Sequence, residues 1–430
     1  MTNVDFDASG NLLVCGMNSG DLPAPTLTPP TDAEDWNHAG GVDGYVAMLD
    51  ANQMQVRWST YVGGTGYDDV YSVRCAPGKI VIAGYTTSPI IQTLSAGGAS
   101  AHNQSSSTFS ATGDLFLYEF TELGEQIYGS YFTYGGYLGL QGLALNENNG
   151  DIVLVGHFTQ NQTSMPVSTT ASWFQSATIS NQQKGFIWRL AANHVVAYST
   201  FVGAGNGHVW LDAVAVRNDG VLFAGGVSWA SNLSTQAAPG LYSANQVQGD
   251  GDAVLLSITP SNSRVWCTYF GGNEDEDGIV ERVMTLSPTA LRLYATGYTR
   301  SNYDSQNNLY FPLNDEGNGA WWDGTMDSAS DVDAFMAAFC TTDLLTGTGE
   351  LEGTGGGLWS VFASQNGGFL LFGLEGQHRI ELFDGSGQLV LQNSVYAQPH
   401  GTTVRNSASL APGSYLMRLD GLWSKKVIVP

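Results

Sequence analysis

The sequence predicts an all-β chain of repeated antiparallel units followed by a small, separate β-domain. The 430 residues are too many for one ordinary core. They include 54 glycines, 18 phenylalanines, 19 tyrosines and 11 tryptophans, a composition typical of many short strands and turns. Strand-like segments recur with a period of about 70 residues, and the composition changes after residue 340.

The repeat is defined by four sets of short apolar segments. One set ends in glycine, with glycines 68 to 72 residues apart, at residues 11–16, 79–84, 151–156, 221–225 and 292–297. A second set opens with a polar residue at 43, 114, 184, 252 and 333, and a third covers 58–64, 130–136, 198–203 and 266–272. A further short strand precedes each glycine-ended one. Four consecutive strands without helical periodicity predict one blade of a β-propeller with at least five units.

The strand count is uneven. The third set has four members where the other sets have five, so the last unit lacks its outer strand. Residues 3–7 form a shortened first strand at the start of the sequence. We therefore expect a longer precursor, with a signal peptide and at least one more strand upstream, because residues 1–5 show neither a basic nor an apolar leader segment.

The units resemble the SBBP-type seven-bladed β-propeller repeat of exported bacterial proteins, whose pattern is W-S-T-Y-x-G-G-x-x-x-D, a strand, and then A-G-x-T-x-S. Residues 56–88 and 264–301 match this pattern, through Trp58, Gly63, Gly64, Asp68 or Asp69, and residues 83–88 in the first, and Trp266, Gly271, Gly272, Asp277 and residues 296–301 in the second. The two units between them are degraded. The resemblance implies a β-propeller over residues 1–345 and no single activity.

A Gly/Thr-rich linker at residues 346–357 separates this part from residues 358–430. The last segment is predicted to be a small Ig-like β-sandwich, because its apolar residues alternate between turns. Its charge also differs: residues 357–430 contain five Lys and Arg against four Asp and Glu, whereas residues 1–356 contain ten against 35.

The tail is similar to the type A C-terminal sorting domain of the type IX secretion system of Bacteroidota. The matching residues are Asp384, Gly387, Gly413, Tyr415, Lys425 and Lys426. The resemblance implies an export signal that outer-membrane machinery recognises, and an extracellular or outer-surface location. The usual Pro-Asn-Pro near the domain start is absent, which leaves the cleavage position and the fate of the tail open. An ordinary Ig-like accessory module is the alternative.

Charge and composition exclude several classes of protein. The net charge of −24 disfavours nucleic acid as a partner, and no apolar run is long enough to span a membrane. Cys15, Cys75, Cys267 and Cys340 lack metal-binding spacing, and we expect buried thiols in strands, with disulfide pairing left open.

Long insertions between the second and third strands recur in every unit, and loops on a rigid scaffold are common recognition sites. The aromatic residues that we predict to bind a partner, together with one neighbouring acid, are Trp36, Trp173, Phe174, Trp229, Tyr242, Trp321, Trp322 and Asp323. Such side chains suit stacking on sugars or gripping a surface protein. The alternative is that they pack their own loops.

Carboxylates gather at the same ends of the strands. Calcium prefers six to eight oxygen ligands, so Asp250, Asp252, Asp275 and Asp277 are candidate calcium ligands. Turn capping is the alternative role for each. No other cofactor is predicted.

No nucleophile, zinc-protease or nucleotide-binding motif occurs, and the seven histidines do not cluster in the sequence. The sequence therefore favours a non-enzymatic, exported protein that binds a glycan or a protein, without deciding the question. Two alternatives stay open. One is a carbohydrate-active hydrolase or lyase that uses Asp69, Asp212, Asp252 or Glu281, and the other is a structural component of a surface matrix.

Overall fold

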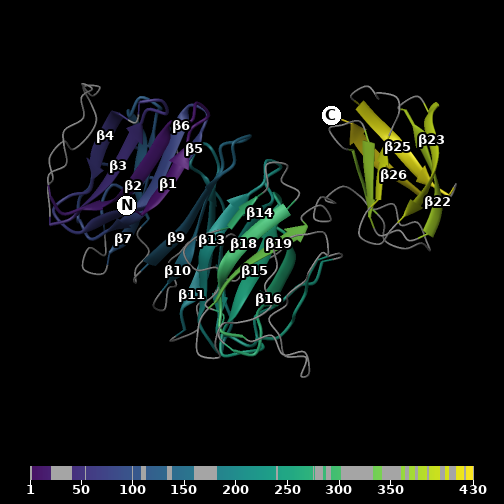
Figure 1. Ribbon diagram of the computed structural model, residues 1–430. Coiled ribbons are helices and arrows are strands. Elements are labelled where there is room, and N and C mark those ends of the chain that lie inside the picture. Colours follow the sequence, from purple (N-terminus) through teal and green to yellow (C-terminus); the bar gives the residue numbers. More distant parts are fainter. Residues whose placement is uncertain are drawn as a thin grey trace. The chain divides into compact units, whose positions relative to one another are not determined.

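The structure is a computed structural model of the 430-residue chain. Its described residues are 2–20, 41–53, 55–98, 100–107, 113–132, 138–158, 182–238, 241–274, 276, 284–286, 292–301, 333–340, 360–363, 368–372, 376–384, 387–397, 402–405, 413–420 and 423–429. The chain forms two compact units, Met1–Leu345 and Thr346–Pro430, and each is described by itself (Figure 1).

The first unit consists of successive antiparallel sheets. The first sheet contains β1 (Asn3–Phe6), β2 (Leu12–Asn18), β3 (Asp43–Leu49) and β4 (Val56–Val62), and the second contains β5 (Asp68–Ala76), β6 (Lys79–Thr86), β7 (Asp114–Phe120) and β8 (Gln126–Phe132). The third contains β9 (Leu138–Leu145), β10 (Ile152–Phe158), β11 (Lys184–Leu190) and β12 (Val196–Val202), and the fourth β13 (Val209–Val216), β14 (Leu222–Ser228), β15 (Asp252–Ile258) and β16 (Arg264–Phe270). The fifth, within the described residues, contains β17 (Met284–Leu286), β18 (Arg292–Thr299) and β19 (Asp333–Cys340). The predicted all-β fold is confirmed.

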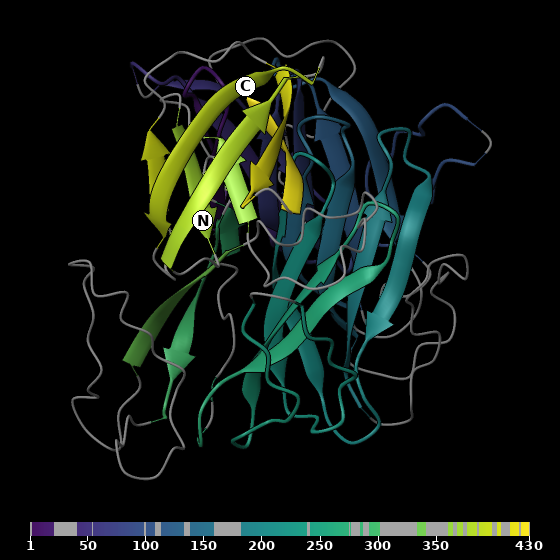
Figure 2. The same cartoon turned by 90° about the vertical axis from the view of Figure 1, so that its right-hand side faces the viewer.

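Each sheet lies against the next one in the chain. The first strand of each sheet makes the connection, because β5 contacts β1, β9 contacts β5, β13 contacts β9 and β17 contacts β13. Figure 2 shows neighbouring sheets of this unit from the side. No extended contact joins the fifth sheet to the first among the described strands, so a closed propeller ring stays a prediction. The outer faces of the two end sheets expose Phe6 (62%) and Met336 (74%).

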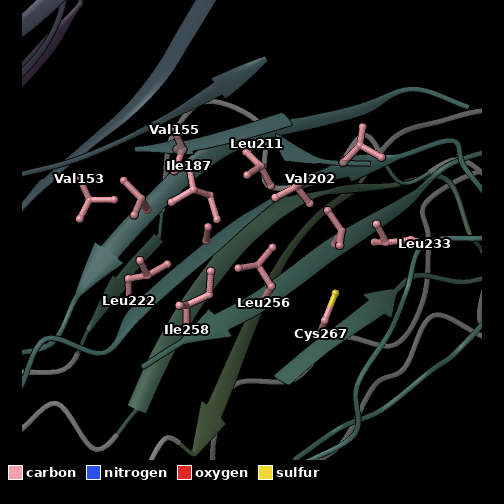
Figure 3. Packing of buried hydrophobic residues seen from close by; sticks show 14 of the residues in the cluster. Val153, Val155, Ile187, Val202, Leu211, Leu222, Leu233, Leu256, Ile258 and Cys267 are labelled. Carbon is pink, nitrogen blue, oxygen red and sulfur yellow. The ribbon is translucent and has the colours of Figure 1, made fainter. Parts of the chain in front are cut away.

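Strands between two neighbouring sheets are buried on both faces. Every residue of β7, β10, β11, β14 and β15 is buried. Between the third and fourth sheets, Val155, Ile187 and Val202 pack toward Leu222, Leu256 and Ile258 (Figure 3). Burial on both faces explains why the sequence shows continuous apolar runs instead of a strict alternation.

Two insertions are described, and both cover the edge of the outer strand of their own sheet. Leu94 exchanges backbone hydrogen bonds of 3.0 and 2.9 Å with Gly129 of β8, and Gln236 exchanges bonds of 2.8 and 2.9 Å with Cys267 of β16. An outer strand otherwise presents unpaired backbone groups to other chains. Part of each insertion therefore completes the sheet instead of forming a free loop.

The second unit contains two antiparallel sheets among its described residues. One has the order β20 (Ser360–Ala363), β21 (Gly368–Phe372) and β24 (Thr402–Arg405). The other has the order β23 (Leu389–Ala397), β22 (Gly376–Phe383), β25 (Gly413–Leu419) and β26 (Trp423–Val429). Two sheets are compatible with the predicted Ig-like sandwich, which remains a prediction.

Two further sequence expectations concern thiols and membranes. Cys75 is partly buried and Cys267 fully buried, and both are free thiols. The part of the chain that the structure describes contains no helix that is long and apolar enough to cross a membrane.

Packing between sheets predicts a strong effect of shortening a buried side chain. We expect Leu256→Ala, at a position 1% exposed, to lower the free energy of unfolding by about 3 kcal/mol, because the cavity adds to the lost burial. Chemical denaturation measures this change. The matched control Leu123→Ala, at a position 67% exposed, should change stability by less than about 0.5 kcal/mol. Equal losses in the two variants would contradict the described packing.

Candidate functional site

Trp229, Asp250 and Asp252 lie at or next to one end of the strands, where β14 ends and β15 begins. There, each third strand begins beside the first strand of the next sheet. A backbone N–H of the next sheet donates to a carbonyl just before the third strand in three places: Asp68 to Val42 (2.9 Å), Val209 to Gln183 (3.1 Å) and Glu276 to Gly251 (2.7 Å). We call these three places the sheet junctions.

At two junctions a buried carboxylate holds the loop in front of it. Asp68 accepts hydrogen bonds from the Gly64 N–H (2.9 Å) and the Ser88 hydroxyl (2.8 Å). Glu276 accepts equivalent bonds from the Gly272 N–H (2.7 Å), the Thr299 hydroxyl (2.7 Å) and Ser301. We call this arrangement the acid clasp.

The acid clasp explains the repeated G-G-x-x-x-D and T-x-S elements of the sequence, since these residues bind one another. Of the alternatives Asp68 and Asp69, Asp68 makes the clasp. In the later unit Glu276 makes it, so the motif match at Asp277, which lies outside the described residues, missed the acting residue.

Asp252 and Glu276 form a carboxyl pair at the junction between the fourth and fifth sheets. Asp252 is fully buried and accepts hydrogen bonds from the backbone N–H groups of Gln248 (2.9 Å) and Gly249 (3.3 Å). Burial raises the pKa of Asp252 to about 7, and the neighbouring Glu276 contributes to the increase. A Cβ on Gly271 would lie within 2.8 Å of both carboxyl groups, so only glycine leaves room for the pair.

Asp252 is one of the four predicted calcium ligands, and its contacts bear on that prediction. Its oxygens already accept N–H donors, an environment that competes with a cation. Asp250 is exposed, and Asp275 and Asp277 lie outside the described residues. Within the described ranges no group of three or more His, Cys, Asp or Glu side chains is placed to hold a metal ion. Calcium therefore stays a prediction without a ligand set.

The junction between the third and fourth sheets has the opposite polarity. Lys184 takes the position of Asp252, is 1% exposed, and donates from Nζ to the carbonyl of Ala204. Val209 stands where Asp68 and Glu276 stand elsewhere. Burial lowers the pKa of Lys184. An ammonium group thus holds a loop carbonyl here, where the other junctions use a carboxylate to hold a loop N–H.

Two tryptophans lie beside this junction, and we call them the indole platform. The rings of Trp210 in β13 and Trp229 after β14 meet edge to face, with centroids 5.0 Å apart. Both side chains are only partly buried. The indole N–H of Trp210 donates to Gln183 Oε1 at 2.5 Å. Gly251 lies against the Trp229 ring, because a Cβ there would come within 2.7 Å of it.

Two histidines support the platform. His157 of β10 stacks on Trp210 with ring centroids 4.7 Å apart, is 8% exposed, and has no hydrogen-bond partner at Nδ1 among the described residues. Burial lowers its pKa to about 4, so the ring is neutral at physiological pH. His208 accepts the Gln183 backbone N–H at Nδ1 (2.9 Å) and lies edge-on to Trp229.

Polar groups without formal charge lie on one side of the platform. Asn206 donates to the Ser231 hydroxyl at 2.6 Å, and both residues are exposed. A Cβ on Gly207 would contact the backbone of Trp229 and Ala230, so the Asn206 loop lies beside the platform.

Of the predicted binding residues, the structure places Trp229 in the platform and Tyr242 away from it. The Tyr242 ring packs on Phe270 at 5.4 Å, and its carbonyl accepts the Trp266 indole N–H at 2.9 Å. Tyr242 therefore packs its own insertion against β16. The remaining predicted binding residues lie outside the described residues: Trp36, Trp173, Phe174, Trp321, Trp322 and Asp323.

The sequence analysis missed Trp210 and Gln183. The repeat itself contains a signal for Trp210. Asp69 pairs with Tyr85, one residue before the end of β6, and Trp210 pairs with Val227, one residue before the end of β14. The repeat therefore aligns Trp210 with Asp69. An aromatic residue in a position that is acidic elsewhere marks a departure from the repeat.

The candidate catalytic acids are mostly buried. Asp69 is 5% and Asp212 8% exposed, Asp252 is engaged as described, and Glu281 lies outside the described residues. These exposures give water and substrate little access to Asp69, Asp212 and Asp252.

In the second unit, the described sorting-motif residues form a turn and two paired strands. The Gln388 N–H donates to Asp384 Oδ1 (3.0 Å), and Gly387 has φ +82°, which favours glycine. Gly413 begins β25 and pairs with Val429, and Tyr415 is buried. Lys425 and Lys426 lie in β26, opposite Met417 and Leu416.

Comparisons with known proteins give little more. No protein-family model matches the chain, and no curated protein matches it. Two solved structures from Porphyromonas gingivalis align with it. One is PorZ, described as an essential bacterial surface component of the type IX secretion system, with 12% identity, a TM-score of 0.31, and coverage of 100% of this chain and 45% of that chain. The other is dimeric latent PorU, with 10% identity, a TM-score of 0.15, and coverage of 88% and 36%. At these scores neither alignment carries an argument about this chain.

The Asp252–Glu276 pair predicts a pH-dependent stability. Because the folded state holds the Asp252 proton up to about pH 7 and the unfolded chain releases it near pH 4, this group makes folding less favourable as pH rises between those values. Asp252→Asn keeps a neutral hydrogen-bonding side chain and lacks this loss. From pH 4.5 to pH 8 the variant should gain at least about 1.4 kcal/mol relative to the unmodified chain.

Urea denaturation at the two pH values measures the gain. The control Asp250→Asn changes an exposed carboxyl two residues away and should show no such gain. A difference between Asp252→Asn and the unmodified chain that stays constant with pH would exclude the protonated pair.

Proposed function

We propose that this chain is an exported, non-enzymatic cell-surface or secreted protein that binds a glycan with the strand end that carries the indole platform. The observation that supports this function best is the partly exposed Trp210–Trp229 pair, set among amide and hydroxyl side chains. Aromatic rings beside a few placed polar groups are the usual lining of sites for small polar ligands. A protein partner, or a matrix role without any glycan ligand, are outcomes of the test.

A propeller of SBBP-like blades would give this site a rigid support. The four-stranded sheets and their contacts through first strands fit such a ring. Lys184 holds the Ala204 carbonyl and Asp252 holds the Gln248 and Gly249 N–H groups, so loops near the platform are held before a ligand arrives.

The hydrolase or lyase alternative has less support. Its candidate acids are buried or already bonded to backbone N–H groups, as Asp252 is to Gln248 and Gly249. A glycosidase needs two carboxyl groups 5 to 10 Å apart, roughly, on either side of the bond to be cleaved. The Asp252–Glu276 pair is in direct hydrogen-bond contact and leaves no room for a sugar between its members.

A glycan screen tests the binding role. The chain should bind at least one polysaccharide without degrading it, and Trp229→Ala should weaken binding at least tenfold. Tyr242→Ala is the matched control from the same insertion, because Tyr242 packs on Phe270 outside the platform, and it should retain binding. Turnover that survives Trp229→Ala but is lost in Asp252→Asn would establish the enzyme alternative instead.

The sorting role of residues 346–430 needs its own test. We propose that this second unit is the type IX secretion signal, on the strength of the motif residues described above. Deleting residues 346–430 in a bacterium with this secretion system should leave the protein inside the outer membrane, as measured by fractionation. Replacement of the Lys425–Lys426 pair by alanines should reduce export in the same direction. Normal surface delivery of the truncated chain would rule out this role.

A further inference from the structure

We infer that the indole platform takes a neutral pyranose glycan and discriminates against anionic ones such as uronate-rich or sulfated polysaccharides. This inference rests on the proposed function and adds the chemical class of the ligand. It follows from four features of the junction between the third and fourth sheets: the arrangement of the partly buried rings, the contacts of the nearby lysine and arginines, the nearby acidic residues, and the polar rim.

The platform offers partly exposed indole surface, to which an apolar sugar face can bind. Trp210 and Trp229 meet at 5.0 Å with an interplanar angle of 74°, so one ring presents an edge to the other. His157 covers one side of Trp210, with ring planes 17° apart, and Gly251 lies against Trp229. These contacts fix both indoles in place, which reduces the entropy that a ligand must remove on binding.

Lys184, Arg189 and Arg217 are each engaged in other contacts, so none of them is available to pair with an anionic ligand at this junction. Lys184 is the nearest ammonium group, but it is 1% exposed and donates to Ala204. Arg189 donates to the Gly220 carbonyl (2.9 Å) and Arg217 binds Asp219 (2.6 Å), both at turns at the other end of the strands. His157 is held neutral by burial. An anion would therefore lose its hydration here without a compensating charge.

Negative charge lies on the same side. Asp250 and Glu274 are exposed, Asp250 being next to Gly251, which lies against Trp229. Residues 1–356 contain 35 Asp and Glu against ten Lys and Arg, so the long-range field also repels anions.

The rim offers groups that suit sugar hydroxyls. Asn206, Ser231 and Gln183 carry amide and hydroxyl groups, which both donate and accept hydrogen bonds. Gln183 is oriented by the Trp210 indole N–H, and His208 by the Gln183 backbone. Neutral hydroxyls can replace water at such groups without a change in charge, whereas a carboxylate or sulfate cannot.

The experiment compares two groups of polysaccharides with the full chain in 150 mM salt. Mannan, xylan and mixed-linkage β-glucan form the neutral group, and alginate, polygalacturonate and chondroitin sulfate form the anionic group. Binding is measured by affinity electrophoresis and calorimetry. We expect binding to at least one neutral polysaccharide, at least tenfold weaker binding for Trp210→Ala and Trp229→Ala, and no detectable binding to the anionic group.

The outcomes separate this inference from the proposed function. Platform-dependent binding to an anionic polysaccharide would overturn the inference and leave the glycan-binding function intact. Neutral binding that Trp210→Ala and Trp229→Ala both retain, while their melting temperatures show folded proteins, would overturn the assignment of the platform. Binding to neither group would overturn the proposed function itself. The double variant Asn206→Ala with Ser231→Ala should weaken neutral binding without altering the rings.

Discussion

The hydrogen bond at each sheet junction is the constraint on which the first unit depends. A backbone N–H at the start of one sheet donates to a carbonyl just before the third strand of the previous sheet, with Asp68, Val209 and Glu276 as the three described donors. Apolar packing between sheets is nondirectional, so it stabilises contact without fixing how far one sheet slides along the next. The junction bond fixes that position, because a shift of one sheet along the next would break it.

Buried charged side chains hold the loops at the junctions, and the sign of their charge differs between junctions. At the start of the third strand, Asp252 holds the loop N–H groups of Gln248 and Gly249, whereas Lys184 in the equivalent place holds the loop carbonyl of Ala204. Each group is buried, and a buried charge is tolerated only when hydrogen bonds compensate for its lost hydration. The exchange of acid for base leaves the loop fixed and changes the local field. The indole platform lies at the junction where this exchange occurs, and where Trp210 replaces an acidic residue.

Much of the fold could be predicted from the sequence because the features that repeat are strands and turns, which depend on the backbone more than on any single side chain. Glycine-ended strands, turn dipeptides and apolar runs recur at fixed spacing, and they correspond to the observed sheets. The roles of single side chains were harder to predict. Tyr242 is in a loop rich in polar residues, yet it packs on Phe270, because that loop pairs with the outer strand, as Gln236 does with Cys267. Glu276 makes the clasp where Asp277 was expected, because the G-G-x-x-x-D spacing counted from Gly271 ends at residue 276, where the acid is a glutamate.

Hydrogen exchange at single-residue resolution tests the junctions most directly. The amides of Asp68, Val209 and Glu276 lie at the ends of strands or in a loop, where exchange within seconds is the ordinary expectation. If the junction bonds hold the sheets in register, these three amides should exchange as slowly as those of the buried strand β15. Exchange of all three at the rate of exposed turns, with β15 still protected, would contradict the account.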